Sequence, residues 1–218
     1  MFSTNNTDGT TTYEWVNNNT ATGLEASGDG NIPSFVGTAG TSPEVSTITV
    51  TPTYTNNGEE CEGPSFTFSI TVNPTPTMDA PPNIEVCNGE EVVIDFTTEN
   101  TGGVTTYEWS IINGPEIGLP DSTTDITDSD SDITFTASNP DPDPRVVIVS
   151  VTPIFTNNGV ECTTSPAETF TITVNPEPQI DDFTETICEG DTFASILPEN
   201  DTNGVVPSGT IYTWVIAD

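Results

Sequence analysis

The stretch VTPIFTNNGVEC occupies residues 151–162, and a near copy, VTPTYTNNGEEC, occupies residues 50–61. The copies lie 101 positions apart, and each has apolar residues at alternate positions before an Asn-Gly pair. Alternation with a period of two predicts a β-strand, and an Asn-Gly pair after such a run predicts a tight hairpin turn. The chain is therefore expected to repeat a β-structured unit about every 101 residues.

Three further motifs recur with similar spacing: TVNPTPTM (71–78) returns as TVNPEPQI (173–180), EVCNGEEV (85–92) as TICEGDTF (186–193), and TTYEW (11–15) as TTYEW (105–109) and TIYTW (210–214). A fixed period of this kind predicts tandem domains. We expect a partial repeat without its N-terminal strands at 1–78, a complete repeat at 79–179 and the truncated start of a third repeat at 180–218. The chain would then be a piece of a longer array.

The complete repeat reads as an all-β, immunoglobulin-like sandwich. Its apolar residues alternate along five runs, and their inward members form the predicted core: Val92, Ile94, Phe96, Tyr107, Trp109, Ile111, Ile133, Phe135, Ala137, Val147, Val149, Val151, Phe170, Ile172 and Val174. About seven short strands in some 100 residues, with one mid-chain Trp, are typical of this fold. Trp15, Trp109 and Trp214 are predicted core residues, one in each unit. The Pro-x-Pro after the last strand would end the ladder and form a semi-rigid connector between units.

The charge balance is extreme. The chain has 34 acidic residues, one basic residue (Arg145) and no His, for a formal net charge of −33. Such a surface repels nucleic acids and anionic lipid headgroups, so neither is an expected partner. No run of 18 apolar residues predicts a membrane span. The start of the sequence does not read as a signal peptide, so any export signal would lie outside this segment.

The four cysteines occupy repeat-equivalent positions. Cys87 and Cys188 begin a Cys-x-Gly pattern, whereas Cys61 and Cys162 follow the Asn-Gly turn. Pairs of the Cys61–Cys87 kind are separated by a strand and a linker, about 30 Å of extended chain. In an immunoglobulin-like topology the first strand and the last hairpin loop meet at one pole. We therefore predict a Cys87–Cys162 disulfide, with the partners of Cys61 and Cys188 outside this segment, and hence an oxidising compartment. Zinc is the rival reading, but the chain has no His and no Cys-x-x-Cys.

Together the Cys-x-Gly, Tyr-x-Trp, Val-Thr-Pro…Asn-Gly-x-x-Cys and Thr-Val-Asn-Pro-x-Pro motifs resemble the PKD-like, immunoglobulin-like repeats of giant Bacteroidetes cell-surface adhesins. The resemblance covers nearly the whole chain, and the matching positions in the complete repeat are Cys87, Trp109, Cys162 and 174–176. It implies type IX secretion, a location at the cell surface with outer-membrane association, and a role in adhesion or gliding motility. The implied partners are neighbouring repeats, an external surface or polysaccharide, and the secretion and gliding machinery.

Calcium is the one candidate cofactor. The loop TDITDSDSD brings together Asp125, Asp128, Asp130 and Asp132, and alternating carboxylates suit Ca²⁺. The alternative reading is a solvated acidic loop. Further candidate carboxylates are those of NPDPDP and of the connectors, namely Asp141, Asp143, Asp79, Asp181 and Asp182. In addition, Asp121-Ser122-Thr123 resembles an O-glycosylation acceptor of exported Bacteroidetes proteins.

The predicted function is non-catalytic. Without His or Lys, a Ser or Cys nucleophile lacks its usual activating base, and a paired-carboxylate site would need a pocket that small sandwiches do not offer. We expect a stalk that projects adhesive regions from the cell. The alternative is that the repeats themselves bind polysaccharide or another surface ligand, with or without calcium. A binder should expose aromatic side chains in its loops, and Tyr54 and Phe155, beside the Asn-Gly turns, are the candidates.

Overall fold

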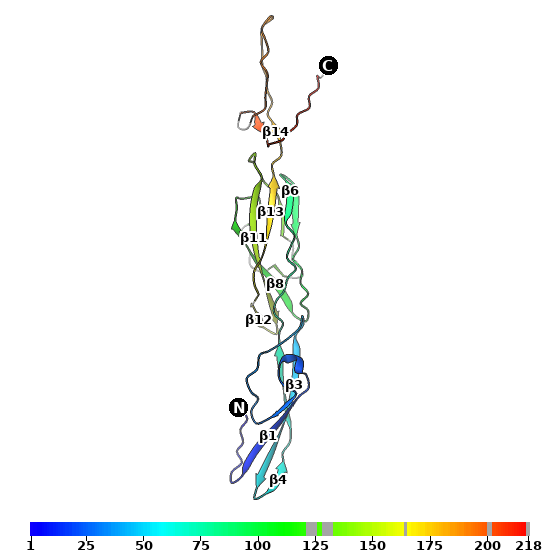
Figure 1. Cartoon of the computed structure of the whole chain (residues 1–218), viewed down its shortest axis with the longest axis vertical. Coiled ribbons are helices and arrows are strands. Elements are labelled where there is room, and N and C mark those ends of the chain that lie inside the picture. The colour runs from blue at the N-terminus through cyan, green and yellow to red at the C-terminus, as the bar shows by residue number, and fades with distance from the viewer. Residues whose placement is uncertain (121–125, 128–132, 164, 200–201, 217–218) are drawn as a thin grey trace. The chain divides into compact units, whose positions relative to one another are not determined.

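The computed structural model describes residues 1–120, 126–127, 133–163, 165–199 and 202–216. Over these residues the chain forms β-strands and a single short helix, η1 (Thr20–Thr22), which confirms the all-β prediction (Figure 1). No helix in the described ranges is long and apolar enough to cross a bilayer. The chain divides into two compact units, 1–78 with 98–106 and 153–165, and 79–97 with 107–152 and 166–218. The repeat borders after residues 78 and 179 stay predictions.

The first unit contains an antiparallel sheet in the order β2-β1-β3-β4, with β5 also paired to β3. Its strands are β1 (Thr10–Asn17), β2 (Ser27–Asp29), β3 (Glu44–Asn56), β4 (Glu59–Glu62) and β5 (Phe66–Val72). The alternating residues of β3 place Ile48 and Val50 on the inner face, where Val50 lies opposite Trp15 of β1. These three residues and Leu24 form the core of this sheet.

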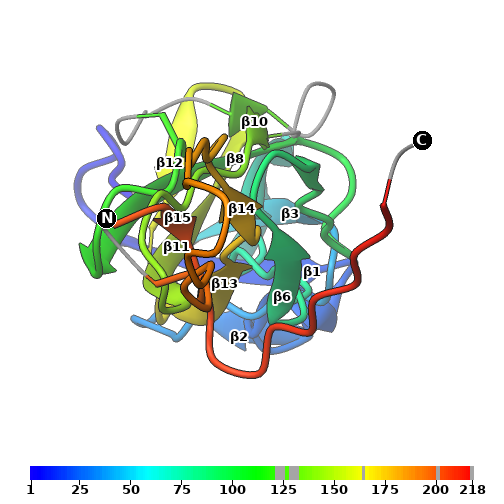
Figure 2. The same cartoon turned by 90° about the horizontal axis from the view of Figure 1, so that it is seen from above.

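The larger sheet of the chain has the order β6-β13-β11-β8-β9, and β12 also pairs with β11 (Figures 1 and 2). Its strands are β6 (Ile84–Cys87), β8 (Val104–Asn113), β9 (Ile126–Thr127), β11 (Arg145–Asn157), β12 (Val160–Cys162) and β13 (Glu168–Asn175). β7 (Glu91–Ile94) pairs with β10 (Ile133–Thr136) in a separate two-stranded sheet. A last short pair joins β14 (Gln179–Ile180) to β15 (Gly204–Val205). The architecture is an immunoglobulin-like sandwich.

The inward faces of the two sheets hold the predicted core of the complete repeat. Every residue of that prediction is at most 6% exposed except Ile111, which is partly exposed near the end of β8. Because side chains alternate across a strand, the period-two pattern was sufficient to identify the buried face. Ile117, in the segment after β8, joins this core at 1% exposed.

Both Asn-Gly pairs form the predicted turns. Asn57 and Asn158 have φ angles of 51° and 50°, and Gly58 and Gly159 follow with 86° and 76°. Two successive positive φ values define the mirror-image turn that matches the twist of a two-residue hairpin. The turn joins β3 to β4, with Asn56 opposite Glu59, and β11 to β12, with Asn157 opposite Val160.

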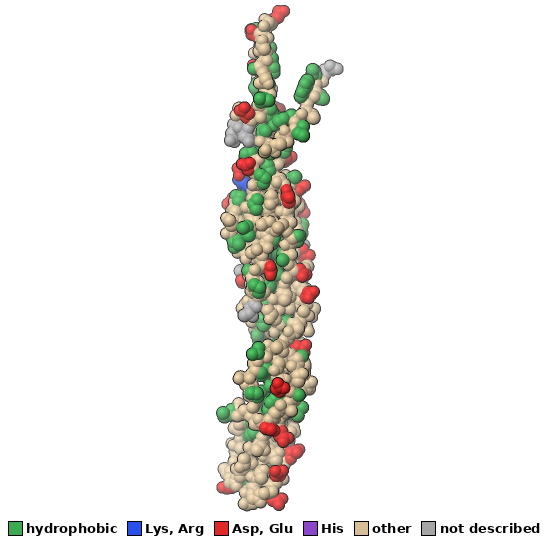
Figure 3. All heavy atoms as spheres, in the orientation of Figure 1, with side chains coloured by type: hydrophobic (Ala, Val, Ile, Leu, Met, Phe, Trp, Pro, Cys, Tyr) green, Lys and Arg blue, Asp and Glu red, His purple; other side chains and the backbone are tan. Residues whose placement is uncertain are grey.

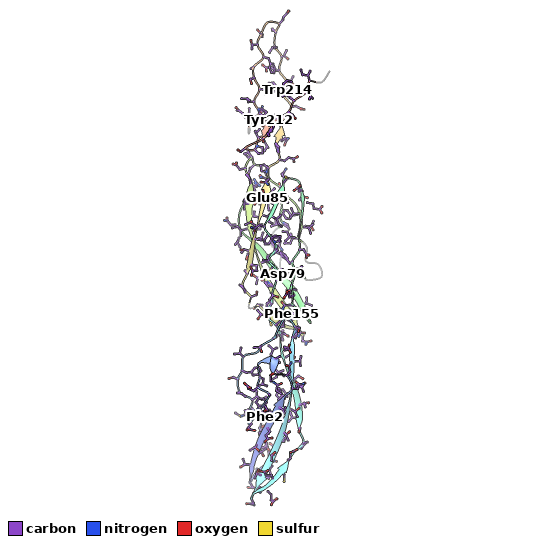
Figure 4. The ribbon with its side chains drawn as sticks, turned by 45° about the vertical axis from the view of Figure 1, so that its right-hand side comes forward. Phe2, Asp79, Glu85, Phe155, Tyr212 and Trp214 are labelled. Atoms are coloured by element: carbon purple, nitrogen blue, oxygen red, sulfur yellow. The ribbon has the colours of Figure 1, made fainter. Side chains whose placement is uncertain are left out.

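Beyond β14, the described residues contain one further strand, β15. Trp214 lies in this C-terminal segment and is 82% exposed, so the prediction that it is a core residue is wrong (Figure 4). Ile211, Val215 and Ile216 beside it are also at least 82% exposed. An alternating run buries its apolar face only when a second sheet covers it, and no strand covers this run in the part of the chain that the structure describes.

Candidate functional site: the clamp around the first connector

The first Pro-x-Pro connector, residues 73–78, is held firmly by its surroundings. Pro74 and Pro76 are both buried, although the connector has no regular secondary structure. In the second connector, Pro176 is half-buried and Pro178 is exposed. Proline restricts the backbone of both connectors. Of these two connectors, the first has both prolines buried and the second has neither fully buried.

A single amide side chain makes most of the polar contacts to this connector. Asn100 is 7% exposed, and its Oδ1 accepts hydrogen bonds from the backbone N of Thr77 at 2.7 Å and from the Thr77 hydroxyl at 3.1 Å. Its Nδ2 donates to the carbonyl oxygens of Thr75 at 3.2 Å and Thr41 at 3.5 Å. Both the oxygen and the nitrogen of the amide therefore form hydrogen bonds, and they hold the connector backbone at two points, Thr75 and Thr77.

Neighbouring residues complete what we call the clamp, defined as Thr41, Thr98, Asn100 and Thr101. The Thr98 hydroxyl donates to the carbonyl of Thr77 at 2.6 Å and to Asn100 Oδ1 at 3.2 Å. The backbone N of Thr101 donates to the carbonyl of Thr41 at 2.8 Å. All of these residues belong to the first compact unit. The clamp restrains backbone geometry and contains no group that could do acid–base or nucleophilic chemistry.

A second contact lies close to the clamp in the same unit. Asn157, at the end of β11, donates from Nδ2 to Oδ1 of Asn73 at 2.9 Å. Asn73 starts the connector, and a shallow pocket there is lined by Asn73, Val72, Val160 and Cys162 among others. Asn157 thus links the Asn-Gly hairpin to the start of the connector.

The sequence analysis missed Asn100, although a signal for it was present. Thr98-Glu-Asn100-Thr corresponds to Thr4-Asn-Asn6-Thr, 94 positions earlier, which is the offset between the two TTYEW motifs. In both copies the Asn backbone N donates to the preceding Thr hydroxyl at 3.0 Å. Asn6 is exposed, so the motif is a local turn that becomes a clamp only where a connector lies against it.

The calcium candidates have three different outcomes. The calcium candidates of the acidic loop, Asp125, Asp128, Asp130 and Asp132, lie outside the described residues. The predicted glycosylation acceptor Asp121-Ser122-Thr123 also lies outside them. Asp141 instead bonds Arg145 Nε at 2.7 Å, and Asp79 accepts a hydrogen bond from the Thr97 hydroxyl at 2.9 Å. Among the described residues, no three acidic or cysteine side chains gather as a metal site would require. Figure 3 shows the carboxylates scattered over the visible face.

The cysteine positions do not support the predicted Cys87–Cys162 bond. All four cysteines are free thiols. Cys87 pairs with Asn175, next to the Val174–Arg145 pair at the start of β11, whereas Cys162 pairs with Phe155. The prediction assumed that both cysteines lie at one pole of one domain, whereas Cys87 belongs to the second compact unit and Cys162 to the first, so their pairing stays a prediction.

The aromatic side chains proposed for ligand binding have structural roles. Phe155 is fully buried (Figure 4) and packs so closely on Gly103 that a Cβ there would overlap its ring. Tyr54, at the equivalent position, lies over Gly9 and donates its hydroxyl to the carbonyl of Thr7 at 2.8 Å. Trp15 and Trp109 are 3% and 4% exposed. Phe155, Trp15 and Trp109 are therefore too buried to stack on a sugar ring, whereas Tyr54 is partly exposed and lines an open pocket.

Three comparisons with known proteins gave the following findings. Residues 84–178, less than half of the chain, match the model of the PKD-like domain family, and this segment is therefore similar to a PKD-like domain. The crystal structure of chicken VE-cadherin EC1-2 aligns with a TM-score of 0.33 and 15% identity, covering 81% of this chain and 88% of that chain. A comparison with curated proteins found no match.

Proposed function

We propose that this chain is a non-catalytic segment of an extracellular stalk, in which PKD-like repeats are joined by clamped connectors and project adhesive regions of a longer adhesin. The observation that carries the proposal is the first connector, with two buried prolines and a buried Asn100 that bonds its backbone on both sides. A connector that needed free movement would gain nothing from these contacts. A spacer that must hold an adhesive region away from a surface requires them.

The path that a pulling force would take through the second sandwich also suits a stalk. The chain enters this sandwich at β6 and leaves it at β13, and these neighbouring strands are parallel, with Ile84 opposite Ile172 and Cys87 opposite Asn175. Tension on the two ends would slide one strand along the other and load their hydrogen bonds together. In a hairpin pulled open from one end, the bonds would instead break one after another.

The acidic surface fits the same role. Repeats that carry like charge resist association with each other and stay soluble. We further propose that the parent protein is exported by type IX secretion in a member of the Bacteroidetes, lies at the outer membrane surface, and serves attachment or gliding. These points rest on the motif resemblance and on the PKD-like match at 84–178.

The second candidate function is ligand binding by the repeats. One observation favours it, an open pocket beside Tyr54 that is lined by Tyr13, Pro52, Tyr54 and Phe66 among others. Phe66 is 45% exposed, so this pocket offers apolar surface of the kind on which a sugar face could pack. The calcium-dependent form of this function rests on Asp125, Asp128, Asp130 and Asp132, which lie outside the described residues.

Adhesion of coated beads separates the two functions. Beads carrying the full chain would be washed over polysaccharide and glass surfaces in calcium and in chelator, with bare beads as the control. The stalk proposal expects no retention above bare beads in either condition. Firm retention would refute it in favour of the binding function, and loss of that retention on chelation or on Tyr54→Ala would identify calcium or the Tyr54 pocket as its basis.

A further inference from the structure

The outer edge of β5 lacks the strand that its counterpart has. β13, the equivalent of β5, lies between β11 and β6, whereas β5 pairs with β3 alone among the described strands. Phe170, Ile172 and Val174 of β13 are at most 2% exposed. The matching residues Phe68, Ile70 and Val72 of β5 are only half-buried. An unpaired edge with an incompletely covered apolar face is a site for strand addition.

The structure also shows where that strand would come from. The ring of Phe2 lies 5.4 Å from that of Tyr13 at 42°, and the ring of Phe96 lies 5.3 Å from that of Tyr107 at 40°. Phe2 and Tyr13 precede Phe96 and Tyr107 by 94 positions each. Phe2 therefore occupies in the first sandwich the place that Phe96 has after β7. A segment joined ahead of Phe2 would reach the β5 edge as β6 and β7 reach β13.

The register predicts which residue such a strand would bring to the connector. Cys87 of β6 lies opposite Asn175, and Asn175 also donates to Glu85 of β6 at 2.9 Å (Figure 4). The residue equivalent to Asn175 in the first sandwich is Asn73. A β6-type strand on β5 would therefore place its cysteine beside Asn73, at the interstrand spacing of about 4.8 Å.

Cys162 lines a pocket at Asn73. Its hairpin is bonded to Asn73 through Asn157. Cys162 is partly covered, whereas Cys61, the equivalent cysteine after the first Asn-Gly turn, is exposed. Neighbouring strands of a sheet have Cα separations that a disulfide can span. Cys162 therefore lies in the pocket at Asn73, and the strand register would bring the cysteine of the added strand to Asn73 as well.

We propose that the β5 edge binds, in parallel, a β6-type strand that precedes Phe2 in the same repeat, and that the cysteine of this strand forms a disulfide with Cys162 of the following repeat. The proposal rests on the tandem arrangement of the proposed function. Two thiols lose their hydrogens and form one S–S bond, while one oxidised glutathione is reduced to two molecules of glutathione. The bond would link consecutive repeats across the clamped connector, in place of a bond within one repeat.

The test extends the full chain at its N-terminus with a copy of residues 79–94, so that the copied Ile94 precedes Met1. The extended chain would be refolded in a glutathione redox buffer and digested without reduction by a Glu-specific protease, because one Arg makes trypsin unsuitable. Mass spectrometry would then map the disulfides. We expect the added cysteine to be bonded to Cys162, and this product to be lost in Cys162→Ser and kept in Cys61→Ser.

A second variant separates docking of the strand from chance oxidation. Asp in place of both Ile84 and Val86 within the added copy keeps its cysteine but removes the apolar residues that face the core. We expect at least a tenfold lower yield of the Cys162 bond. Bonding of the added cysteine to Cys61, a free added cysteine after full oxidation, or an equal yield from the Asp variant would each overturn the proposal. The bead assay is independent of this result, since a stalk without the bond would still fail to adhere.

Discussion

Replacing Asn100 by Ala should loosen the first connector without unfolding either sheet. The substitution removes two hydrogen bonds to connector backbone, from Thr77 N at 2.7 Å and to the Thr75 carbonyl at 3.2 Å. Each is worth about 1 kcal/mol net, and water can reach the exposed Thr75 and Thr77, so no large desolvation cost is added. We expect a loss of about 2 kcal/mol, or about a 30-fold increase in the population with an open clamp.

Two measurements on the full chain would check this. Urea titration would give the change in unfolding free energy. Pulsed electron spin resonance would give the distance distribution between labels at Val36→Cys and Val104→Cys, with the four native cysteines replaced by Ser. Val36 and Val104 are 82% and 50% exposed, and they lie on either side of the connector in the sequence. We expect a narrow distribution in the parent and a broad one in Asn100→Ala.

The matched control is Asn6→Ala, in the same local turn. Asn6 is exposed, and its backbone N keeps its bond to the Thr4 hydroxyl after the substitution. We expect a change below about 0.5 kcal/mol and an unaltered distance distribution. If Asn100→Ala behaved like Asn6→Ala in both measurements, the clamp would not restrain the connector, and the main support for the stalk would be lost.

Three further outcomes are expected. Gly103→Ala should destabilise the chain by about 1–3 kcal/mol in urea titrations, because its Cβ would overlap the Phe155 ring; Gly40→Ala, which meets nothing within 4 Å, is the control, and equal effects would contradict the packing argument. Val86→Asp should lower the unfolding force in single-molecule pulling by weakening the contact of β6 with β13, whereas Val160→Asp, at a position 58% exposed, should not; an unchanged force for Val86→Asp would refute the proposed force path. Raising NaCl from about 10 to about 150 mM shortens the screening length from about 30 to about 8 Å, so the melting temperature should rise at a net charge of −33, and a fall would refute the self-repulsion argument.

Strand positions could be predicted from the sequence because they depend on a pattern within one segment. The period of two identified the inner faces of β7, β8, β10, β11 and β13, and Asn-Gly identified both hairpin turns. Burial could not be predicted as well, because it depends on another segment. Ile70 and Ile172 occupy the same place in the same motif, yet among the described strands Ile70 has β3 on one side alone, whereas Ile172 lies between β11 and β6. Trp214 likewise has the sequence pattern of a core residue but is exposed, because no described strand covers its segment.

The cysteine pairing stays a prediction, because the sequence does not encode how strands are ordered in a sheet. The motif Cys-x-Gly does have a local explanation. The Cys87 N–H donates to the Glu90 carboxylate at 2.9 Å, and Gly89 between them has a φ of 85°. Cys188 repeats this turn with Asp191 at 3.2 Å, although the described residues 181–187 directly before it form no strand. Local chemistry therefore fixes the turn, whereas the parallel pairing of β6 with β13 decides which thiol the cysteine can meet.

Residues of the clamp, the Asn-Gly hairpin and the cysteine motifs have a local role in their own turn or strand, and some of them have a second role in contact with the connector. In isolation, Thr-x-Asn-Thr is a turn, Asn-Gly closes a hairpin, and Cys-x-Gly ends a strand. Where a connector lies against them, Asn100 and Asn157 bond to that connector at Thr77 and Asn73, and Cys162 lines the pocket at its start. In the proposed stalk, the same motifs would therefore serve both the local fold and the hold on the connector. Selection for a stiff array would retain polar residues at these loops, and it would leave the outer faces free to vary as long as they remain acidic.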